Sequence, residues 1–120
     1  MTTPVVTYRE AGRRFLAQAH TELDAGDLRQ ASEKGWGAAA QMVKAVAQAR
    51  GWPHTAHRHL LTNVTDLTEE VGDPGVHRLF GSAHLLHINF YENTLNDELI
   101  ADYLNDVEQF VARLEQILDA

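Results

Sequence analysis

Histidine is the residue type through which this chain can do the most chemistry. The 120 residues include seven histidines and no cysteine, which excludes disulfides, thiolate metal sites, iron–sulfur clusters and cysteine nucleophiles. His84 and His87 lie in a segment of helical periodicity, in which side chains three residues apart share a face. At about 100° per residue, that face also carries His77, Phe80 and Tyr91. The pattern indicates either a ligand-binding face or imidazoles that pack at the edge of a helical core.

The same two imidazoles can share a metal ion if another helix supplies a further carboxylate or imidazole. The candidates for that ligand are His54, His57 and His59, which flank a helix break. The chain has neither an HExxH nor an ExxH motif. We therefore predict no metal and no other cofactor, and a histidine-bound metal is the less favoured alternative.

Two arginine–histidine pairs suggest acid–base chemistry on a phosphodiester. Arg50 precedes His57, and Arg78 precedes His84. An arginine can hold the phosphate while a histidine moves a proton to or from a ribose 2′-hydroxyl. Arg78 and His84 belong to one expected helix and project about 120° apart. They are the candidate catalytic pair of a metal-independent ribonuclease, and an exposed arginine beside a structural histidine is the alternative.

Helices must position these residues, because hydrophobic periodicity predicts helix along almost the whole chain. Thr7-Tyr8-Arg9-Glu10 has the form of a capping box for a first helix, which ends at Ala25-Gly26. Asp27 caps a second helix, which runs to Arg50 and stops at Gly51-Trp52-Pro53. Small residues along this second helix indicate close packing against its neighbours.

Three further helices are expected in the second half of the chain. The third spans about Thr55 to Val71, and the fourth spans roughly Gly75 to Glu92 behind an Asp73 N-cap. The last follows Asn93-Thr94, and its buried stripe is expected to be Leu99, Tyr103, Val107, Phe110, Leu114 and Ile117 or Leu118. No segment has the pattern of a strand. The fold prediction is therefore all-α: a single up-and-down antiparallel bundle of about five helices, with residues 1–120 as one domain.

The net charge limits how the chain can bind nucleic acid. Seventeen acidic residues against ten basic ones give a formal charge of −7, which disfavours non-specific binding by phosphate neutralisation. The excess belongs to residues 92–120, whereas the first 91 residues are neutral and hold every histidine. The sequence shows neither a signal peptide nor a membrane span. We expect a cytoplasmic protein without membrane contact.

Two stretches resemble the HEPN superfamily, and in particular its small stand-alone prokaryotic members. One is Ala31 to Ala45 on the second helix, ASEKGWGAAAQMVKA, and the other is Leu86 to Glu92 before the last helix, LHINFYE. The similarity extends from about residue 8 to residue 118. It implies a helical up-and-down bundle that forms a homodimer and binds nucleotides or RNA. It also implies either a metal-independent ribonuclease or a partner of a minimal nucleotidyltransferase in a toxin–antitoxin pair.

The HEPN ribonuclease motif is an arginine, four to six other residues and a histidine, often with a tyrosine soon after. Tyr91 stands where that tyrosine would be, but Asn89 occupies the place of the histidine and has no arginine at that distance upstream. Arg78 and His84 keep the spacing but leave Tyr91 too far downstream. We interpret the motif as degenerate, so the resemblance implies a nucleotide-, RNA- or partner-binding module. The expected ligand-binding residues are His87, Asn89, Tyr91, Lys34 and Trp36, with Lys34 meeting phosphate and Trp36 stacking on a base.

Overall fold

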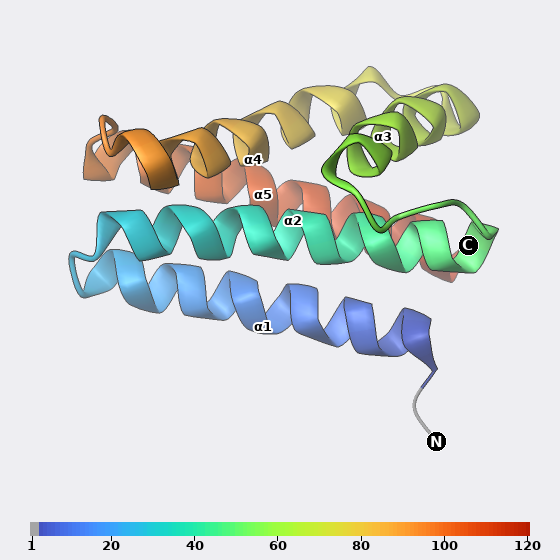
Figure 1. Ribbon diagram of the computed structural model, residues 1–120, viewed down its shortest axis with the longest axis horizontal. Helices are drawn as coiled ribbons and strands as arrows, with labels where there is room; N and C mark the ends of the chain where they lie inside the picture. The colour runs from blue at the N-terminus through green and yellow to red at the C-terminus, as the bar shows by residue number, and fades with distance from the viewer. Residues whose placement is uncertain (1–2) are drawn as a thin grey trace.

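The structure is a computed structural model that describes residues 3–120. These residues form five α-helices and no strand. The helices are α1 (Pro4–Asp24), α2 (Leu28–Arg50), α3 (His57–Val71), α4 (Pro74–Glu92) and α5 (Asp97–Asp119) (Figure 1). Among these helices, none is long and apolar enough to cross a lipid bilayer. The predicted all-α class is confirmed.

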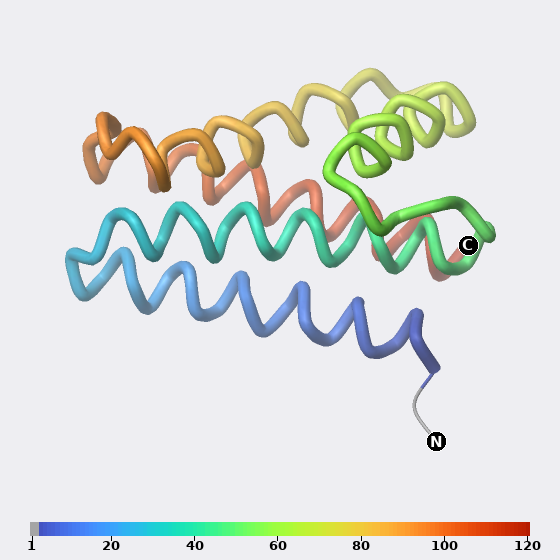
Figure 2. The backbone as a smooth tube through the Cα atoms, viewed as in Figure 1, coloured from blue at the N-terminus to red at the C-terminus, as the bar shows by residue number. Residues whose placement is uncertain are grey.

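Four of the helices pack as an up-and-down bundle. Figure 2 shows α1, α2, α4 and α5 running alternately in opposite directions, with α3 set at an angle in the connection between α2 and α4. α2 is central to the arrangement, because it contacts each of the other four helices. A side chain on α2 can therefore meet residues from any other part of the bundle.

The first helix begins earlier than the capping box predicts. Its N-cap is Thr3, whose Oγ1 accepts a hydrogen bond from the Val6 amide at 3.2 Å, and Pro4 is the first helical residue. Proline fits this position because its missing N–H would be unpaired there in any case. Thr7 lies inside the helix, and its hydroxyl donates to the Thr3 carbonyl at 3.1 Å. The prediction of a helix start at Thr7 was wrong, because Thr3-Pro4 forms a complete start one turn upstream.

The other predicted boundaries are close to those observed. Asp27 caps α2 by accepting from the Gln30 amide at 3.1 Å, and Gly51 ends it in the left-handed conformation with φ 73°. α3 begins at His57, two residues later than expected, and its start is held by a histidine. His59 Nδ1 accepts from the amides of Ala56 at 3.0 Å and Thr55 at 3.2 Å. An imidazole nitrogen therefore serves as the N-terminal cap of α3.

The buried face of α5 differs from the predicted stripe at its first turns. Leu99 is 40% exposed, whereas Ile100 and Leu104 are fully buried. Asn96 caps α5 by accepting from the Leu99 amide at 2.9 Å. Leu99 lies about 100° from Ile100 around the helix, and it is Ile100 that faces the core. The expectation that Leu99 is buried was wrong, while Val107, Phe110 and Leu114 are buried as predicted.

Arginines of α1 neutralise part of the acidic end of α5. Arg9 donates to Asp119 at 2.7 and 2.8 Å and to Glu115 at 3.1 Å, and Arg13 pairs with the same Glu115. Hydrogen bonds from Arg13 hold the pKa of Glu115 below its usual value, and those from Arg9 do the same for Asp119. These arginines are therefore engaged by the chain's own carboxylates.

Gly35 lies where α2 packs closely against α4 and α5. A Cβ atom at Gly35 would lie 2.6 Å from Leu104 Cδ2 and 2.8 Å from Leu86 Cδ1, and both leucines are fully buried. A Cβ at Gly81, also inside a helix, would meet nothing within 4 Å. We expect Gly81→Ala to stabilise the fold by about 1 kcal/mol through helix propensity.

Gly35→Ala brings the same propensity gain but forces two packed leucines to move, which costs about 1–3 kcal/mol. The free energies of unfolding of the two variants, measured in urea, should differ by that amount, with Gly35→Ala the less stable. Equal stabilisation of both variants would show that the leucines repack at no cost.

Candidate functional site

Three histidines gather around one tryptophan where α2, α3 and α4 meet. We call His57, His84 and His87 the histidine cluster. The ring centroid of Trp36 lies 4.6 Å from that of His87, 5.2 Å from His57 and 6.3 Å from His84. His57 is 5.5 Å from His87 and 5.9 Å from His84. The cluster thus joins the first residue of α3 to the middle of α4, over an indole from α2.

The α2–α3 connection brings His57 to this place. After Gly51 the chain folds back beside α2, as Figure 1 shows. The Arg50 guanidinium then pairs with Glu70 near the end of α3, with Nε at 2.9 Å from Oε1. Buried Asn63 of α3 also donates to the Pro53 carbonyl at 3.0 Å. These contacts fix α3 against α2, so that its first residue lies over Trp36.

Partial burial and like charge act together on His57. Desolvation lowers the pKa of its imidazole below the usual value, and positive charge on His87 or His84 lowers it further. The ring is nevertheless exposed to solvent on one side. The cluster therefore favours a neutral His57 until a negative charge arrives beside it.

Two of the cluster's nitrogen atoms are buried without a hydrogen bond. They are Nδ1 of His84 and Nδ1 of His87. Oε2 of Glu33 on α2 is also buried without a hydrogen-bond partner. Glu33 Oε2 lies 3.6 Å from His87 Nδ1. A carboxylate and an imidazole nitrogen at this distance make an ion pair when the ring is protonated.

An aromatic strip leads from the cluster to the far end of α4. It consists of Phe90, Tyr91, His87 and His57, with Arg29 of α2 at one end. Successive ring centroids lie 5.1 Å (Phe90–Tyr91), 5.5 Å (Tyr91–His87) and 5.5 Å (His87–His57) apart. The Arg29 guanidinium lies 5.4 Å from the Phe90 centroid. Tyr91 is 69% exposed, so the strip offers both rings and a cation to solvent.

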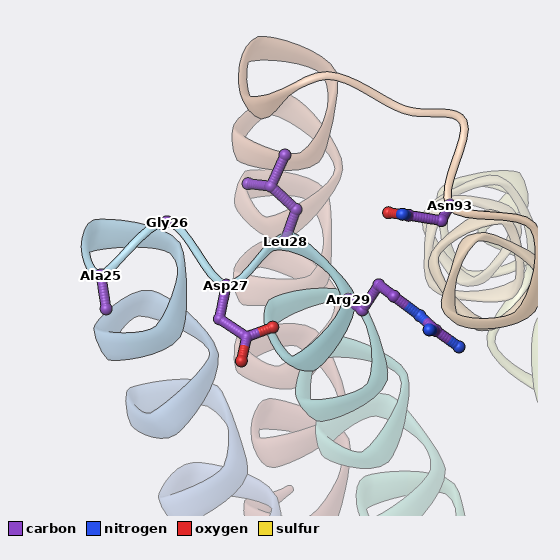
Figure 3. Close-up of a pocket in the computed structure, with 6 residues that line it drawn as sticks. All are labelled: Ala25, Gly26, Asp27, Leu28, Arg29 and Asn93. Atoms are coloured by element: carbon purple, nitrogen blue, oxygen red, sulfur yellow. The ribbon is translucent and has the colours of Figure 1, made fainter.

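An open depression of about 510 Å³ adjoins the Arg29 end of the strip. Its lining residues are Ala25, Gly26, Asp27, Leu28, Arg29 and Asn93 (Figure 3). Figure 3 shows the Arg29 side chain reaching toward the end of α4 near Asn93, while the Asp27 side chain points away from it. Arg29 Nε donates to the Phe90 carbonyl at 3.0 Å, which holds the guanidinium beside the strip.

The histidines do not form a metal site in this arrangement. Within residues 3–120 there is no group of three or more His, Asp or Glu side chains placed to hold a metal ion. His57 and His87 stack with an angle of 25° between their rings, so their planes lie side by side. His54 and His59 are engaged elsewhere, with the Trp52 carbonyl at 2.9 Å and the start of α3 respectively. A metal would need these rings to turn.

The structure does not bring Arg78 and His84 together. Arg78 is exposed near the start of α4. The pKa of Asp73 is lowered mainly by the hydrogen bond that it accepts from the Gly75 amide, then by Arg113, and least by the charge of Arg78. His84 lies in the histidine cluster. His77 is also separate from the cluster, in a shallow pocket with Thr65 and Thr68 of α3.

The five expected ligand-binding residues do not lie together in the structure. His87 and Tyr91 lie on the strip. Trp36 is 7% exposed and lies beneath the imidazoles, so a ligand would meet the histidines before the indole. Lys34 points to α1, where its Nζ lies 5.0 Å from the Phe15 centroid.

Asn89 lies apart from the other four, because it is 1% exposed and its side chain makes three hydrogen bonds within the protein. Its Nδ2 donates to Ser32 Oγ at 2.8 Å, and its Oδ1 accepts from the amides of Thr94 and Leu95, each at 2.9 Å. Asn89 thus ties the α4–α5 connection to α2.

A family model for the archaeal PaREP1/PaREP8 family matches residues 7–111. The chain belongs to this family. The crystal structure of a protein from Sulfolobus solfataricus is similar to the PaREP1/PaREP8 chain with a TM-score of 0.80 and 21% identity, over 92% of this chain and 98% of that one. At this identity the likeness shows the shared fold. No curated protein matches the sequence.

The HEPN resemblance is supported as far as a small helical bundle. Family membership is shown for PaREP1/PaREP8, while HEPN membership stays a prediction. Sequence reasoning found His84, His87 and Tyr91 of the candidate site through helical periodicity, and it marked His57 only as a candidate metal ligand or partner of Arg50. It missed Glu33 as a contact of His87 and Arg29 as the end of the strip.

Proposed function

We propose that this PaREP1/PaREP8 chain is a helical module that binds single-stranded RNA or nucleotides along the aromatic strip. The observation that carries the proposal is the continuous run of rings from His57 to Phe90, which ends at a guanidinium. Bases stack on such rings whatever their sequence. His57 and Arg29 supply the contacts to phosphate.

The charge distribution supports a single-stranded ligand that touches only a small area. A duplex would cover much of the bundle and meet the acidic α5, since the chain carries a charge of −7. A few stacked bases need only the strip. Burial and the neighbouring imidazoles lower the pKa of His57, so its ring becomes positive when a phosphate lies beside it and adds no permanently basic surface.

We also keep the homodimer as part of this proposal. Leu85 and Ile88 on α4 are 44% and 37% exposed, and Gly81 on the same helix has open space where a Cβ would lie. Two copies that meet along this face would bury apolar surface next to His84. Sedimentation velocity tests this point, and a monomer at all concentrations would contradict it.

The HEPN resemblance also implies roles that are more specific than RNA binding. A nucleotidyltransferase partner and a toxin–antitoxin role remain predictions for which the neighbouring gene is the direct observation. Metal-independent cleavage by Arg78 and His84 remains the alternative, and its test is the loss of RNA cleavage in His84→Ala with an unchanged melting temperature.

Binding is tested by fluorescence polarisation of a labelled single-stranded RNA. Tyr91→Ala should raise Kd about tenfold, because stacking on an aromatic ring contributes about 1–3 kcal/mol per base. Tyr91→Phe keeps the ring and should bind as the parent does. His57→Ala should weaken binding similarly, whereas His20→Ala, which removes an exposed histidine of α1, is the matched control.

The same assay should depend on pH and salt. The lowered pKa of His57 leaves its ring neutral in the free chain at pH 8, and a phosphate nearby favours the charged form. Affinity should therefore rise as pH falls from about 8 to about 6, and fall with added salt. If Kd does not change with pH, with salt or in Tyr91→Ala, the aromatic strip is not the binding surface.

A further inference from the structure

Glu33 and His87 each have a buried polar atom without a partner, and only one neutral tautomer of the imidazole suits both atoms. Oε2 of Glu33 and Nδ1 of His87 are both buried without a hydrogen-bond partner, and they lie 3.6 Å apart. A buried polar atom left unpaired is costly, and natural proteins seldom keep one. A carboxylate oxygen can only accept, so in the neutral ring the hydrogen that suits this contact is the one on Nδ1 of His87.

That assignment fixes the other nitrogen of the ring. A neutral imidazole carries one N–H, so a hydrogen on Nδ1 leaves Nε2 as a lone-pair acceptor. Nε2 of His87 is not among the buried atoms that lack a partner, and the His87 side chain is 24% exposed. Within residues 3–120, no hydrogen bond engages Nε2. The acceptor therefore faces the ligand side of the aromatic strip.

The position of this acceptor matches a sugar better than a base. His87 lies between Tyr91 and His57, with 5.5 Å between ring centroids on each side. If two bases stack on the flanking rings, the sugar that joins them passes over His87. Ribose presents a 2′-hydroxyl donor there, and deoxyribose presents none.

We infer that Glu33 is a positioning residue that makes His87 Nε2 a hydrogen-bond acceptor on the strip, and that the strip consequently binds RNA in preference to DNA of the same sequence. The inference rests on the proposed function for its ligand. The role of Glu33 itself rests only on the contact between Glu33 and His87.

The first experiment reads the tautomer without any ligand. Long-range ¹H–¹⁵N correlation spectra of the histidine rings at about pH 8 distinguish Nδ1–H from Nε2–H. His87 should be in the Nδ1–H form in the parent. In Glu33→Gln, whose amide can also donate to Nδ1, the Nε2–H form should appear. Glu10→Gln, at an exposed position of α1, is the matched control and should leave the spectrum of His87 unchanged.

The second experiment compares Kd for a single-stranded RNA and for DNA of the matching sequence at the same pH. The parent and Glu10→Gln should bind the RNA about five to ten times more tightly, as expected for one hydrogen bond. In Glu33→Gln the ratio should fall towards one, with RNA affinity reduced and DNA affinity unchanged. The change in ratio is a readout that a loss of stability alone would not give.

Each outcome bears on a different part of the inference. An Nε2–H tautomer of His87 in the parent overturns the role of Glu33, and this result requires no variant to fold. The Nδ1–H tautomer with equal affinity for RNA and DNA overturns the selectivity and leaves the proposed function standing. Absence of binding to either nucleic acid overturns the proposed function and the selectivity, while the spectra still decide the tautomer.

Discussion

Trp36→Ala is expected to lower the free energy of unfolding by about 3–5 kcal/mol, the cost of deleting a large buried aromatic side chain. The indole is 7% exposed, and it packs against Phe80 at 5.6 Å between ring centroids as well as against the histidine cluster. Its removal leaves a cavity bounded by α2, α3 and α4. Chemical denaturation followed by circular dichroism measures the loss.

Trp36→Phe is the informative companion to that variant. It keeps a ring under His87 and should lose less than half as much stability. Because the indole supports the imidazoles from below, Trp36→Ala should also weaken RNA binding at temperatures where it remains folded. A loss of stability below about 1 kcal/mol would mean that the histidines close over the gap.

Asn89→Ala is expected to cost about 3 kcal/mol or more. The change removes three hydrogen bonds: the amides of Thr94 and Leu95 lose their acceptor, while the Ser32 hydroxyl loses the donor Asn89 and keeps its own bond to the Leu28 carbonyl. Each net hydrogen bond contributes about 1 kcal/mol, and each buried group left unpaired adds to the cost. Asn105→Ala, at an exposed position of α5, should change stability by no more than about 0.5 kcal/mol.

The same variant decides between two roles for Asn89. If Asn89 acts through the α4–α5 connection, the variant loses stability, and any loss of binding follows from that. If Asn89→Ala keeps its stability and loses RNA affinity, then Asn89 contacts the ligand, as the sequence resemblance implies. Urea unfolding and polarisation measurements on one preparation separate the two results.

Local sequence signals predicted most of the fold because most helix boundaries here are local events. Asp27, Gly51 and Asp73-Pro74 act through their own side chains and backbone angles, so their effect is readable within a few residues. The helix start was wrongly placed at Thr7 because residues in the order of a capping box can also occur inside a helix. The burial of Leu99 was wrongly predicted because Leu99 and Ile100 are both apolar. Their side chains project about 100° apart around the helix, and only the packing of α5 decides which of them is buried.

The site was less predictable because it depends on helices that meet in space. Periodicity placed His84, His87 and Tyr91 on one face of α4. Nothing in the spacing of Glu33 and His87 indicates that they meet, since their contact depends on how α2 and α4 pack. Lys34 was expected beside Trp36, but two residues along a helix turn the side chain by about 200°, which sends Lys34 to α1.

The histidine that caps α3 ties the order of the ligand surface to one side chain outside it. His59 holds the start of the helix through the lone pair of Nδ1, which accepts from the amides of Thr55 and Ala56. A side chain without such an acceptor leaves those amides unpaired. His57 is the first residue of the same helix, so loss of the cap also frees the backbone that carries its ring. A substitution of His59, which is not part of the aromatic strip, should therefore weaken binding through the order of the surface rather than through a lost contact with the ligand.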